Sequence, residues 1–474
     1  NMRMTKIICT IGPASSNIDI LRQLTQAGMD VVRLNRSHGT QEEHAAIIDS
    51  IKELRQETGL PLAILLDLKG PEIRTGTFVG GRVELLPGQV FNIYSQETLG
   101  DSTKMSVSFE NFHHAVKPGT PILIDDGLIE LIVVSIENEV VRTNVVVGGE
   151  LSDFKGVNLP NTPSLLPALD EKDFSDIRFA VEQEVDYIAV SFARSAEDIS
   201  QARAALDNEG GQAIKIIAKI ENQQGIDNSD EIILASDGLM VARGDLGVEI
   251  APEHVPMVQK RLIEQCYRSG KPSIIATQML DSMIYNPRPT RAEVSDIANA
   301  VLDGTSCLML SGETAIGKYP VKSVETMARI SLGVESEIDY WADMDKDSLE
   351  YNCDNVPDAI SHAAASTAKD LDSAAIVVMT FSGTTARLIS RFRPACPILA
   401  MTVSETSQQQ LNMNWGVRPY LVPVASSTDE VFRQAVEVAK LSDLVHVGDT
   451  IVLAGGSASG RSGTTNTIRA EVVE

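Results

Sequence analysis

Short apolar runs alternate with amphipathic segments over the first two thirds of the chain. Segments with the period of a helix lie between most of these runs, for example at 18–27, 41–57 and 195–208. The runs themselves are typical of buried parallel strands, and eight of them occur before residue 311: KIICT (6–10), VVRLN (31–35), LAILLD (62–67), DYIAVSF (186–192), IKIIAKI (214–220), GLMVA (238–242), PSIIAT (272–277) and CLML (307–310). This alternation predicts an α/β fold, a closed (β/α)₈ TIM barrel formed by residues 1–68 and 170–338.

Residues 69–169 interrupt the alternation. They are Gly-rich and contain strand-like stretches such as VELLPGQVFNIY and LIELIVVSIENEVVRTNVVVGG. Alternation with a period of two indicates strands that are buried on one face. We therefore expect a small β-barrel domain, inserted between the third barrel strand and its helix at 171–183. At the catalytic face of a TIM barrel such an insertion would act as a lid.

The pattern changes again after Glu337. A charged stretch at 340–357 is expected to be irregular, and a helix from about Ala359 and the strands AAIVVMT, PILAMT, PYLVPV and TIVLAG follow it. These elements predict a separate open α/β domain at 339–474. Its segment TFSGTTAR (380–387) follows a strand and opens a helix, as loops that bind phosphate do. A capping turn without a ligand is the alternative.

Composition restricts the partners of the chain. Its 474 residues suffice for two to four domains, and a net charge of −25 argues against nucleic acid or an anionic membrane surface as the main partner. The five cysteines are scattered, which is typical of reduced thiols in a cytoplasmic protein. No apolar run approaches the ~20 residues of a membrane span, and the start of the chain lacks the apolar region of a signal peptide.

Polar residues end or directly follow the predicted barrel strands, where TIM barrels carry their chemistry. They are Asn35, Asp67, Ser191, Lys219, Asp245 and Thr277. Glu221 and Asp245 stand at the tips of two such strands, and two carboxylates beside a lysine suit a hard divalent cation such as Mg²⁺. A pair of surface salt bridges is the alternative for the two acids.

Nine ordered motifs resemble those of pyruvate kinases over essentially the whole chain. They are IICTIGP (7–13), VRLNRSHG (32–39), LLDLKGPEIRTG (65–76), KGVNLPN (155–161), KIENQQG (219–225), MVARGDLGVE (240–249), IIATQMLDSM (274–283), NPRPTRAEVSD (286–296) and MLSGETAIGKYP (309–320). The resemblance implies transfer of a phosphoryl group from phosphoenolpyruvate to ADP, giving pyruvate and ATP, with Mg²⁺ (or Mn²⁺) and K⁺. It also implies a cytoplasmic homotetramer of the bacterial type that lacks an additional C-terminal phosphotransfer domain.

The resemblance assigns catalytic and substrate-binding roles to residues of these motifs. Glu221 and Asp245 would hold Mg²⁺, and Lys219 would face the transferred phosphoryl group and the enolate oxygen. Arg33 matches a phosphate-binding arginine, and Thr277 would lie near the substrate carboxylate or a proton relay. The backbone of Ala242, Arg243 and Gly244 would meet the substrate carboxylate.

Further assignments concern K⁺, the nucleotide and an effector. Asn35, Ser37, Asp67 and the carbonyl of Leu68 match K⁺ ligands, and a glutamate at the position of Glu72 accompanies K⁺ dependence. Residues on the nucleotide side are Thr10, Pro13, Asn35, His38, Arg74 and Lys155. The C-terminal loops would bind a phosphorylated sugar or a nucleotide through Thr380, Ser382, Gly383, Thr384, Thr385, Arg461, Ser462 and Gly463.

The chain departs from the family pattern at two positions. Arg36 replaces a phenylalanine between two predicted K⁺ ligands. Its charge would repel K⁺ if it faced the site, whereas alternation along a strand end also allows it to face away. Leu68 replaces a threonine, which should matter little because the expected ligand is a backbone carbonyl.

Two other functions compete with the kinase. A barrel lyase or aldolase would use the same acidic pair to stabilise an enolate, but it would leave the inserted domain, Lys155 and Glu72 unexplained. A metabolite sensor that has lost turnover would be consistent with Arg36, but not with an intact set of Lys219, Glu221, Asp245 and Thr277. A requirement for ADP in pyruvate formation would distinguish the kinase from both.

Overall fold

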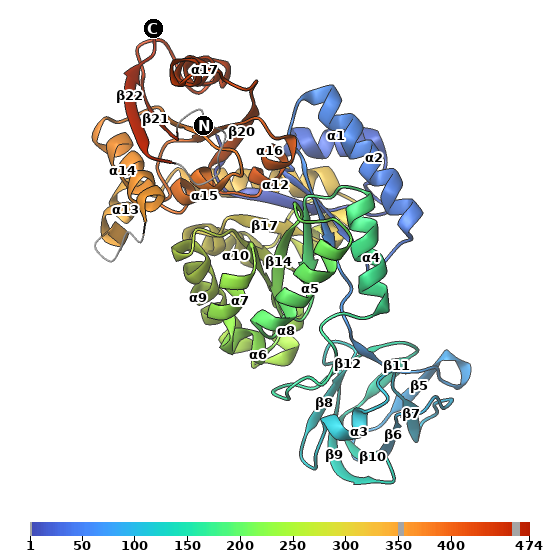
Figure 1. Cartoon of the computed structure of the whole chain (residues 1–474). Helices are drawn as coiled ribbons and strands as arrows, with labels where there is room; N and C mark the ends of the chain where they lie inside the picture. Colours follow the sequence, from blue (N-terminus) through green and yellow to red (C-terminus); the bar gives the residue numbers. More distant parts are fainter. Residues whose placement is uncertain (1, 349–354, 457–464) are drawn as a thin grey trace.

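Eight parallel strands close into a barrel at the centre of the molecule (Figure 1). The computed structural model describes residues 2–348, 355–456 and 465–474. Around the barrel the strands follow the order β1 (Lys6–Thr10), β17 (Cys307–Leu310), β16 (Ser273–Ala276), β15 (Gly238–Ala242), β14 (Lys215–Ile220), β13 (Tyr187–Val190), β3 (Ala63–Asp67) and β2 (Val31–Asn35). All eight predicted strands are confirmed, so the predicted TIM barrel is correct.

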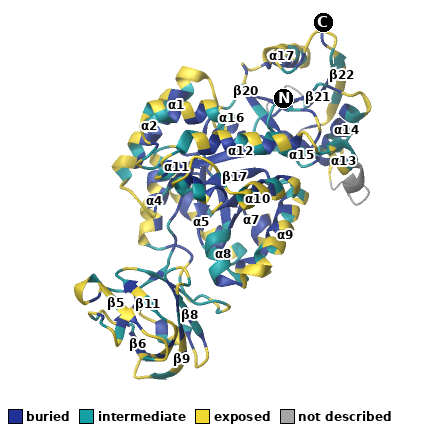
Figure 2. Cartoon of the chain, turned by 180° about the vertical axis from the view of Figure 1, so that it is seen from behind, coloured by how far each residue is buried: buried dark blue, intermediate teal, exposed yellow. Residues whose placement is uncertain are grey.

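Alternate strand residues serve two different cores. Ile7 and Cys9 of β1 pack outward against helices, whereas Ile8 points into the barrel interior with residues such as Leu65 and Met240. The strands are therefore buried on both faces (Figure 2), which explains their continuous apolar sequences. The main outer helices are α1 (Ile18–Ala27), α2 (Gln41–Thr58), α4 (Glu171–Glu182), α5 (Ala196–Asn208), α7 (Ser229–Ala235), α9 (Val255–Arg268), α10 (Arg291–Leu302) and α12 (Pro320–Glu335).

The inserted segment forms a β-domain with its own apolar core, which includes Phe91, Phe112 and Leu131. Its edge strands are joined by an isolated bridge between Thr75 and Val107, so the sheet curls back on itself. This sheet has the order β4 (Ile73–Arg74), β12 (Gly156–Asn158), β8 (Pro121–Ile124), β9 (Ile129–Glu137), β10 (Val140–Val147), β6 (Val90–Tyr94) and β7 (Lys104–Ser106), and a second sheet pairs β5 (Arg82–Leu85) with β11 (Gly149–Ser152).

The C-terminal domain is an open sheet with helices on both sides, as predicted. Its strand order is β20 (Val417–Leu421), β19 (Ile398–Thr402), β18 (Ala375–Met379), β21 (Thr450–Gly455) and β22 (Thr467–Val472), and its helices are α14 (Val356–Asp370), α15 (Thr384–Ser390), α16 (Glu405–Leu411) and α17 (Thr428–Leu441).

Two elements of this region differ from the sequence prediction. Residues Tyr340–Ser348 form a helix, α13, where an irregular stretch was expected, because Trp341 and Met344 pack against Phe392. Strand β22 was not predicted. It is an antiparallel edge strand with mostly exposed residues, so its sequence carries little apolar signal, and pairing with β21 places it.

The C-terminal domain and the inserted domain lie at opposite ends of the barrel (Figure 1). At the amino-terminal ends of the strands, Lys6 Nζ donates to the Val417 carbonyl (2.7 Å) and Tyr187 Oη donates to the Gln410 carbonyl (2.7 Å). The inserted domain therefore lies at the carboxyl ends of the barrel strands (Figure 1). Among the described residues, no helix has the length and apolar character needed to cross a membrane.

Candidate active site

An ammonium group with little exposure to solvent lies at the carboxyl end of the barrel, since the Lys219 side chain is 11% exposed. Lys219, near the end of β14, has its Nζ 3.2 Å from Asp67 Oδ1 and 3.2 Å from Glu221 Oε1. The same Nζ donates to Ser191 Oγ at 2.9 Å. These side chains come from the ends of β3, β13 and β14, which are neighbours in the barrel. The barrel thus brings together the strand-end residues that the sequence pattern singled out.

Asp67 forms ion pairs with two positively charged side chains, Lys219 and Arg33. Its Oδ2 accepts from Arg33 Nε at 2.8 Å, and Arg33 Nη1 donates to Thr10 Oγ1 at 2.8 Å. Burial alone would raise the pKa of Asp67, but the charges of Lys219 and Arg33 outweigh it, so this pKa lies below its ordinary value. Burial opposes the charge of Lys219, yet Asp67 and Glu221 raise its pKa. Asp67 and Lys219 are therefore charged near neutral pH.

The positive charge near Glu221 is too small to offset its burial and the neighbouring carboxylate of Asp245. It is 1% exposed, and its Oε2 accepts from the Phe192 amide at 2.5 Å. Burial raises the pKa of Glu221, and the nearby Asp245 raises it further against the opposing effect of Lys219. A cation bound between Glu221 and Asp245 would remove this penalty, so the carboxylates fit a divalent metal ion.

Glu221 and Asp245 are the two candidate ligands of a divalent cation in this site. In the described part of the chain, no group of three or more His, Cys, Asp and Glu side chains is arranged to hold a metal. Two carboxylate ligands would leave coordination positions open, as Mg²⁺ sites that also bind substrate oxygens require. Asp245 belongs to α8 (Arg243–Glu249) and lines a cavity between the inserted domain and the barrel, whereas Glu221 is buried.

Strained backbone marks the end of β16. Thr277 has φ +73° and Gln278 has φ +57°, and a β-branched residue rarely adopts a positive φ outside functional sites. Thr277 Oγ1 accepts from the Gly244 amide at 2.7 Å, and Arg243 Nη2 donates to the Thr277 carbonyl at 2.6 Å. The loop that carries Thr277 is thus tied to the start of α8, where Ala242 is the N-cap.

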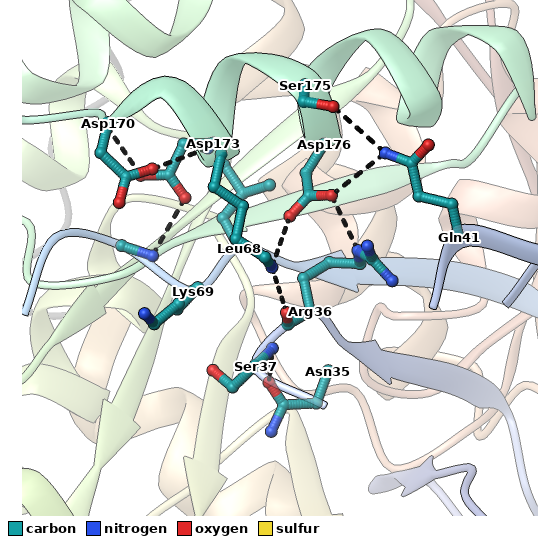
Figure 3. A network of polar contacts seen from close by, with 12 residues as sticks. Asn35, Arg36, Ser37, Gln41, Leu68, Lys69, Asp170, Asp173, Ser175 and Asp176 are labelled. Atoms are coloured by element: carbon teal, nitrogen blue, oxygen red, sulfur yellow. Dashed lines mark hydrogen bonds and ion pairs between the residues drawn. The ribbon is translucent and has the colours of Figure 1, made fainter. Parts of the chain in front are cut away.

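Oxygen atoms suited to a monovalent cation lie around the ends of β2 and β3. Asn35 Oδ1 accepts from the Ser37 amide at 3.1 Å, and Ser191 Oγ donates to the Leu68 carbonyl at 2.8 Å. Asp67 Oδ1 is buried and forms an ion pair with Lys219 Nζ at 3.2 Å. The donor set consists of oxygens alone, which fits K⁺, and Figure 3 shows Asn35 and Ser37 beside the segment of Leu68 and Lys69.

Arg36 faces away from these oxygens. Its side chain is 4% exposed, its Nε donates to Asp176 Oδ1 at 2.9 Å, and its guanidinium lies 5.6 Å from the centre of the Phe179 ring. Both partners belong to α4. Of the two orientations that the sequence allowed, the structure has the one that avoids repulsion of a bound cation.

A cavity of about 380 Å³ lies between the inserted domain and the barrel. Lys155 Nζ pairs with Asp125 Oδ1 at 3.0 Å within the inserted domain, and Arg74 Nε donates to Glu72 Oε1 at 2.6 Å. All four of these residues line the cavity, opposite Ser191, Asn222, Asp245 and Glu249 of the barrel. Asn158 Nδ2 crosses the gap to Glu249 Oε1 at 2.7 Å.

The predicted nucleotide residues occupy different environments. Thr10 is buried at the centre, where its Oγ1 donates to the Leu310 carbonyl. Pro13 and His38 are exposed on loops at the barrel rim. Arg74 and Lys155 belong to the inserted domain. The structure therefore divides this set between the barrel and the lid rather than joining it in one cluster.

Several residues of the site carried no assigned role. Ser191 connects Lys219 to the Leu68 carbonyl, and Asp125 holds Lys155. Ser191 lies at the end of a predicted strand, so its position was a usable signal. The amide of Phe192 reaches Glu221 because Phe192 has φ +54°, which no sequence pattern indicates.

The first C-terminal loop is held by internal contacts. Thr380 is buried and its amide donates to the Met401 carbonyl, and Gly383 has φ +83° at the start of α15. Ser382 and Thr384 share a hydrogen bond of 3.0 Å, and Thr385 bonds to Thr465. Arg387, which the sequence did not single out, donates to Thr384 Oγ1 at 3.2 Å. The predicted effector residues Arg461, Ser462 and Gly463 lie outside the described residues.

A TIM barrel with a cluster of charged side chains at the carboxyl ends of its strands has the architecture of an enzyme. The model of the pyruvate kinase barrel domain matches residues 2–324, and that of the pyruvate kinase alpha/beta domain matches residues 358–470. The chain belongs to the pyruvate kinase family.

Three relatives illustrate this similarity. Pyruvate kinase of Sporosarcina psychrophila is 49% identical over 474 residues, covering 100% of this chain and 81% of the relative. Pyruvate kinases of Clostridium perfringens and Clostridium acetobutylicum are 46% and 47% identical, each with 100% of both chains covered. The similarity thus extends over all three domains.

Proposed function

We propose that this chain transfers the phosphoryl group of phosphoenolpyruvate to ADP, giving pyruvate and ATP in glycolysis. The observation that carries the proposal is the position of Lys219 between the buried Asp67 and Glu221, at the carboxyl end of a barrel of this family. The lyase and sensor hypotheses explain fewer features of this site, because neither requires Lys155 and Arg74 on the inserted domain.

Lys219 and Arg33 would stabilise the transferred group. Phosphoryl transfer develops negative charge on the oxygens in flight, so fixed cations in a site with little water lower the barrier. Arg33 would bind the phosphate and Lys219 would face the phosphoryl group and the enolate oxygen. Thr277, on its strained loop, would orient the substrate carboxylate with the backbone of Ala242, Arg243 and Gly244, or support protonation of the enolate.

Glu221 and Asp245 would hold Mg²⁺ or Mn²⁺. The divalent ion would neutralise the repulsion between these carboxylates and the anionic substrate, which amounts to about 4 kcal/mol for two unit charges 4 Å apart at an effective dielectric near 20. K⁺ would be held by Asn35, Ser37, Asp67 and the Leu68 carbonyl. The raised pKa of Glu221 supports the divalent cation, and the oxygen ligands at the ends of β2 and β3 support K⁺.

The inserted domain (69–169) would act as a lid on the nucleotide. Thr10, Pro13, Asn35 and His38 would contact ADP from the barrel, and Arg74 and Lys155 would approach it from the lid. In the present structure Lys155 pairs with Asp125 and Arg74 with Glu72. Binding of the nucleotide phosphates would therefore replace carboxylate partners with phosphate partners.

Regulation and assembly complete the proposal. A phosphorylated sugar or nucleotide would bind the C-terminal domain (339–474) at Thr380, Ser382, Gly383, Thr384, Thr385 and the segment containing Arg461, Ser462 and Gly463. The assembly would be a cytoplasmic homotetramer. Hydroxyl groups at the start of α15 support the effector site, and the buried free thiols of Cys9, Cys266, Cys307 and Cys396 support a reducing compartment.

A coupled assay of pyruvate formation tests the reaction. We expect turnover that requires phosphoenolpyruvate, ADP, Mg²⁺ and K⁺ together. Pyruvate formation without ADP would contradict a kinase, and condensation of pyruvate with an aldehyde would select the lyase. A change from sigmoid to hyperbolic dependence on phosphoenolpyruvate, on addition of sugar phosphates, would establish the effector.

A further inference from the structure

Arg36 is held at each of its polar groups. Its amide donates to the Asp67 carbonyl at 2.9 Å, and its own carbonyl accepts from Lys172 Nζ. Its guanidinium donates to Asp176 Oδ1, to the Thr40 carbonyl (3.2 Å) and to His44 Nδ1 (2.6 Å). The residue between Asn35 and Ser37 is therefore fixed to β3, α2 and α4 at once.

The partner carboxylate is itself buried and shared. Asp176 is 1% exposed, and its other oxygen pairs with Lys172 at 3.2 Å. Gln41 Nε2 lies 3.5 Å from Oδ1 of the same carboxylate. Figure 3 shows Asp176 of α4 and Gln41 of α2 beside Arg36, next to the loop that carries Asn35 and Ser37. A buried ion pair of this geometry fixes the position of the chain segments that it connects.

The first turn of α4 also holds the outgoing connection to the inserted domain. Asp173 Oδ1 accepts from the Gly70 amide at 3.0 Å, and Asp173 forms a capping box with Asp170. Gly70 follows Leu68 by two residues. Helix α4 thus contacts both chain segments that supply the proposed K⁺ ligands, through Arg36 on one side and through Gly70 on the other.

We propose that Arg36 is a positioning residue for the monovalent-cation site, holding the loop of Asn35 and Ser37 against α4 through Asp176. The inference rests on the proposed K⁺ site and names a role for a residue that departs from the family pattern. Phenylalanine at this position would fill space but would make none of the guanidinium contacts. Removal of the guanidinium would also leave the buried carboxylate of Asp176 with weaker partners.

Arg36→Phe and Arg36→Lys test the inference, with Arg55→Met as a matched control. Arg55 forms a comparable buried ion pair with Asp186 (2.8 Å), which directly precedes β13 at the opposite end of the barrel. Thermal unfolding would be followed during titration with K⁺, at constant ionic strength with tetramethylammonium. Mg²⁺ and phosphoenolpyruvate would be present and ADP absent, so that no turnover occurs and the midpoint shift reports binding.

For Arg36→Phe we expect the half-saturating K⁺ concentration to rise about tenfold, as for loss of a group that supports a metal ligand. Arg36→Lys should lie between this variant and the natural protein, since lysine retains the charge but not the fork of donors. Arg55→Met should lower the unfolding temperature without changing the K⁺ dependence. The half-saturating Mg²⁺ concentration should not change in any variant.

An unchanged K⁺ dependence in both Arg36 variants would overturn the inference, and tighter binding would show that Arg36 repels the cation. If Arg55→Met raised the half-saturating K⁺ concentration equally, the effect of the Arg36 variants would reflect a general loss of stability. That result would also overturn the positioning role of Arg36. If the natural protein shows no K⁺-specific shift, the proposed cation site itself is wrong. Pyruvate formation by the natural protein would then still decide the proposed reaction independently.

Discussion

Buried charges of opposite sign dominate the active site at the scale of single residues. Lys219 balances Asp67 and Glu221, and Arg33 adds a second cation at Asp67. Replacement of Lys219 by methionine removes the ammonium group, so the buried carboxylates of Asp67 and Glu221 repel each other without a positive charge between them. We expect kcat to fall by about 100-fold or more, the effect of losing a preorganised charge at a transition state. A value within threefold of the natural protein would contradict this role, and circular dichroism would verify the fold.

A single buried histidine, His44, should make the stability of the fold depend on pH. Burial and then the charge of Arg36 lower the pKa of His44 from 6.5 to about 4. The unfolded chain therefore binds a proton near pH 6.5 that the folded chain binds only near pH 4. Stability from His44 is present above pH 6.5 and is lost as the pH falls toward 4. Urea midpoints over this range should fall more steeply for the natural protein than for His44→Gln. Parallel profiles would refute the assignment.

At the scale of elements, the connection from β3 to the inserted domain depends on a glycine. Gly70 has φ +71°, and a Cβ there would lie 2.6 Å from Ser191 Cβ. Gly59, at the end of α2, has φ +68° with no atom within 4 Å of the added Cβ. Both alanine variants should lose about 1–2 kcal/mol of stability from the left-handed conformation.

Only Gly70→Ala should also impair catalysis, because displacement of Ser191 disturbs its hydrogen bonds to Lys219 and to the Leu68 carbonyl. We expect a loss of kcat of at least about tenfold, as small misplacements in active sites are costly. Steady-state kinetics of the two variants make the comparison. Equal kcat values would show that the contact between Gly70 and Ser191 is irrelevant to the reaction.

At the scale of the whole molecule, Arg393 connects the C-terminal domain to the barrel. It is buried, donates to the Gly304 carbonyl (2.9 Å) on the barrel side, and lies 4.9 Å from the Trp415 ring and 5.5 Å from the Tyr267 ring. Arg393→Met should therefore cost about 2 kcal/mol. It should also separate unfolding of the two domains.

Tryptophan fluorescence can follow this separation, because Trp341 and Trp415 are the two tryptophans of the chain and both pack against C-terminal elements. Fluorescence and circular dichroism should give separate urea transitions in Arg393→Met. They should coincide in the control Arg418→Met, whose guanidinium bonds within the domain to the Ser442 carbonyl. Coincident transitions in both variants would show that Arg393 does not couple the domains.

The sequence predicts most of this architecture because parallel barrel strands are buried on both faces and therefore appear as continuous apolar runs. It fails for β22, whose exposed residues are placed by their partner strand, and for α13, whose helix is stabilised by packing of Trp341 and Met344. Both elements depend on contacts with other parts of the domain, which local periodicity does not contain.

The same limit applies to the site. Strand-end positions identify Asp67, Lys219 and Asp245 without a structure, because all barrel strands end at one face. The direction of Arg36 is not predictable in this way, since its partner Asp176 lies 140 residues further along the chain. The positive φ of Thr277 and Phe192, which places their polar atoms in the site, is equally absent from the sequence pattern.

Binding of Mn²⁺, measured by electron paramagnetic resonance, tests the central claim most directly, namely that Glu221 and Asp245 hold a divalent cation beside Lys219. The natural protein should bind the ion with phosphoenolpyruvate present, and Glu221→Gln should weaken this binding by at least about tenfold. Equal Mn²⁺ affinity in the natural protein and Glu221→Gln would contradict the account.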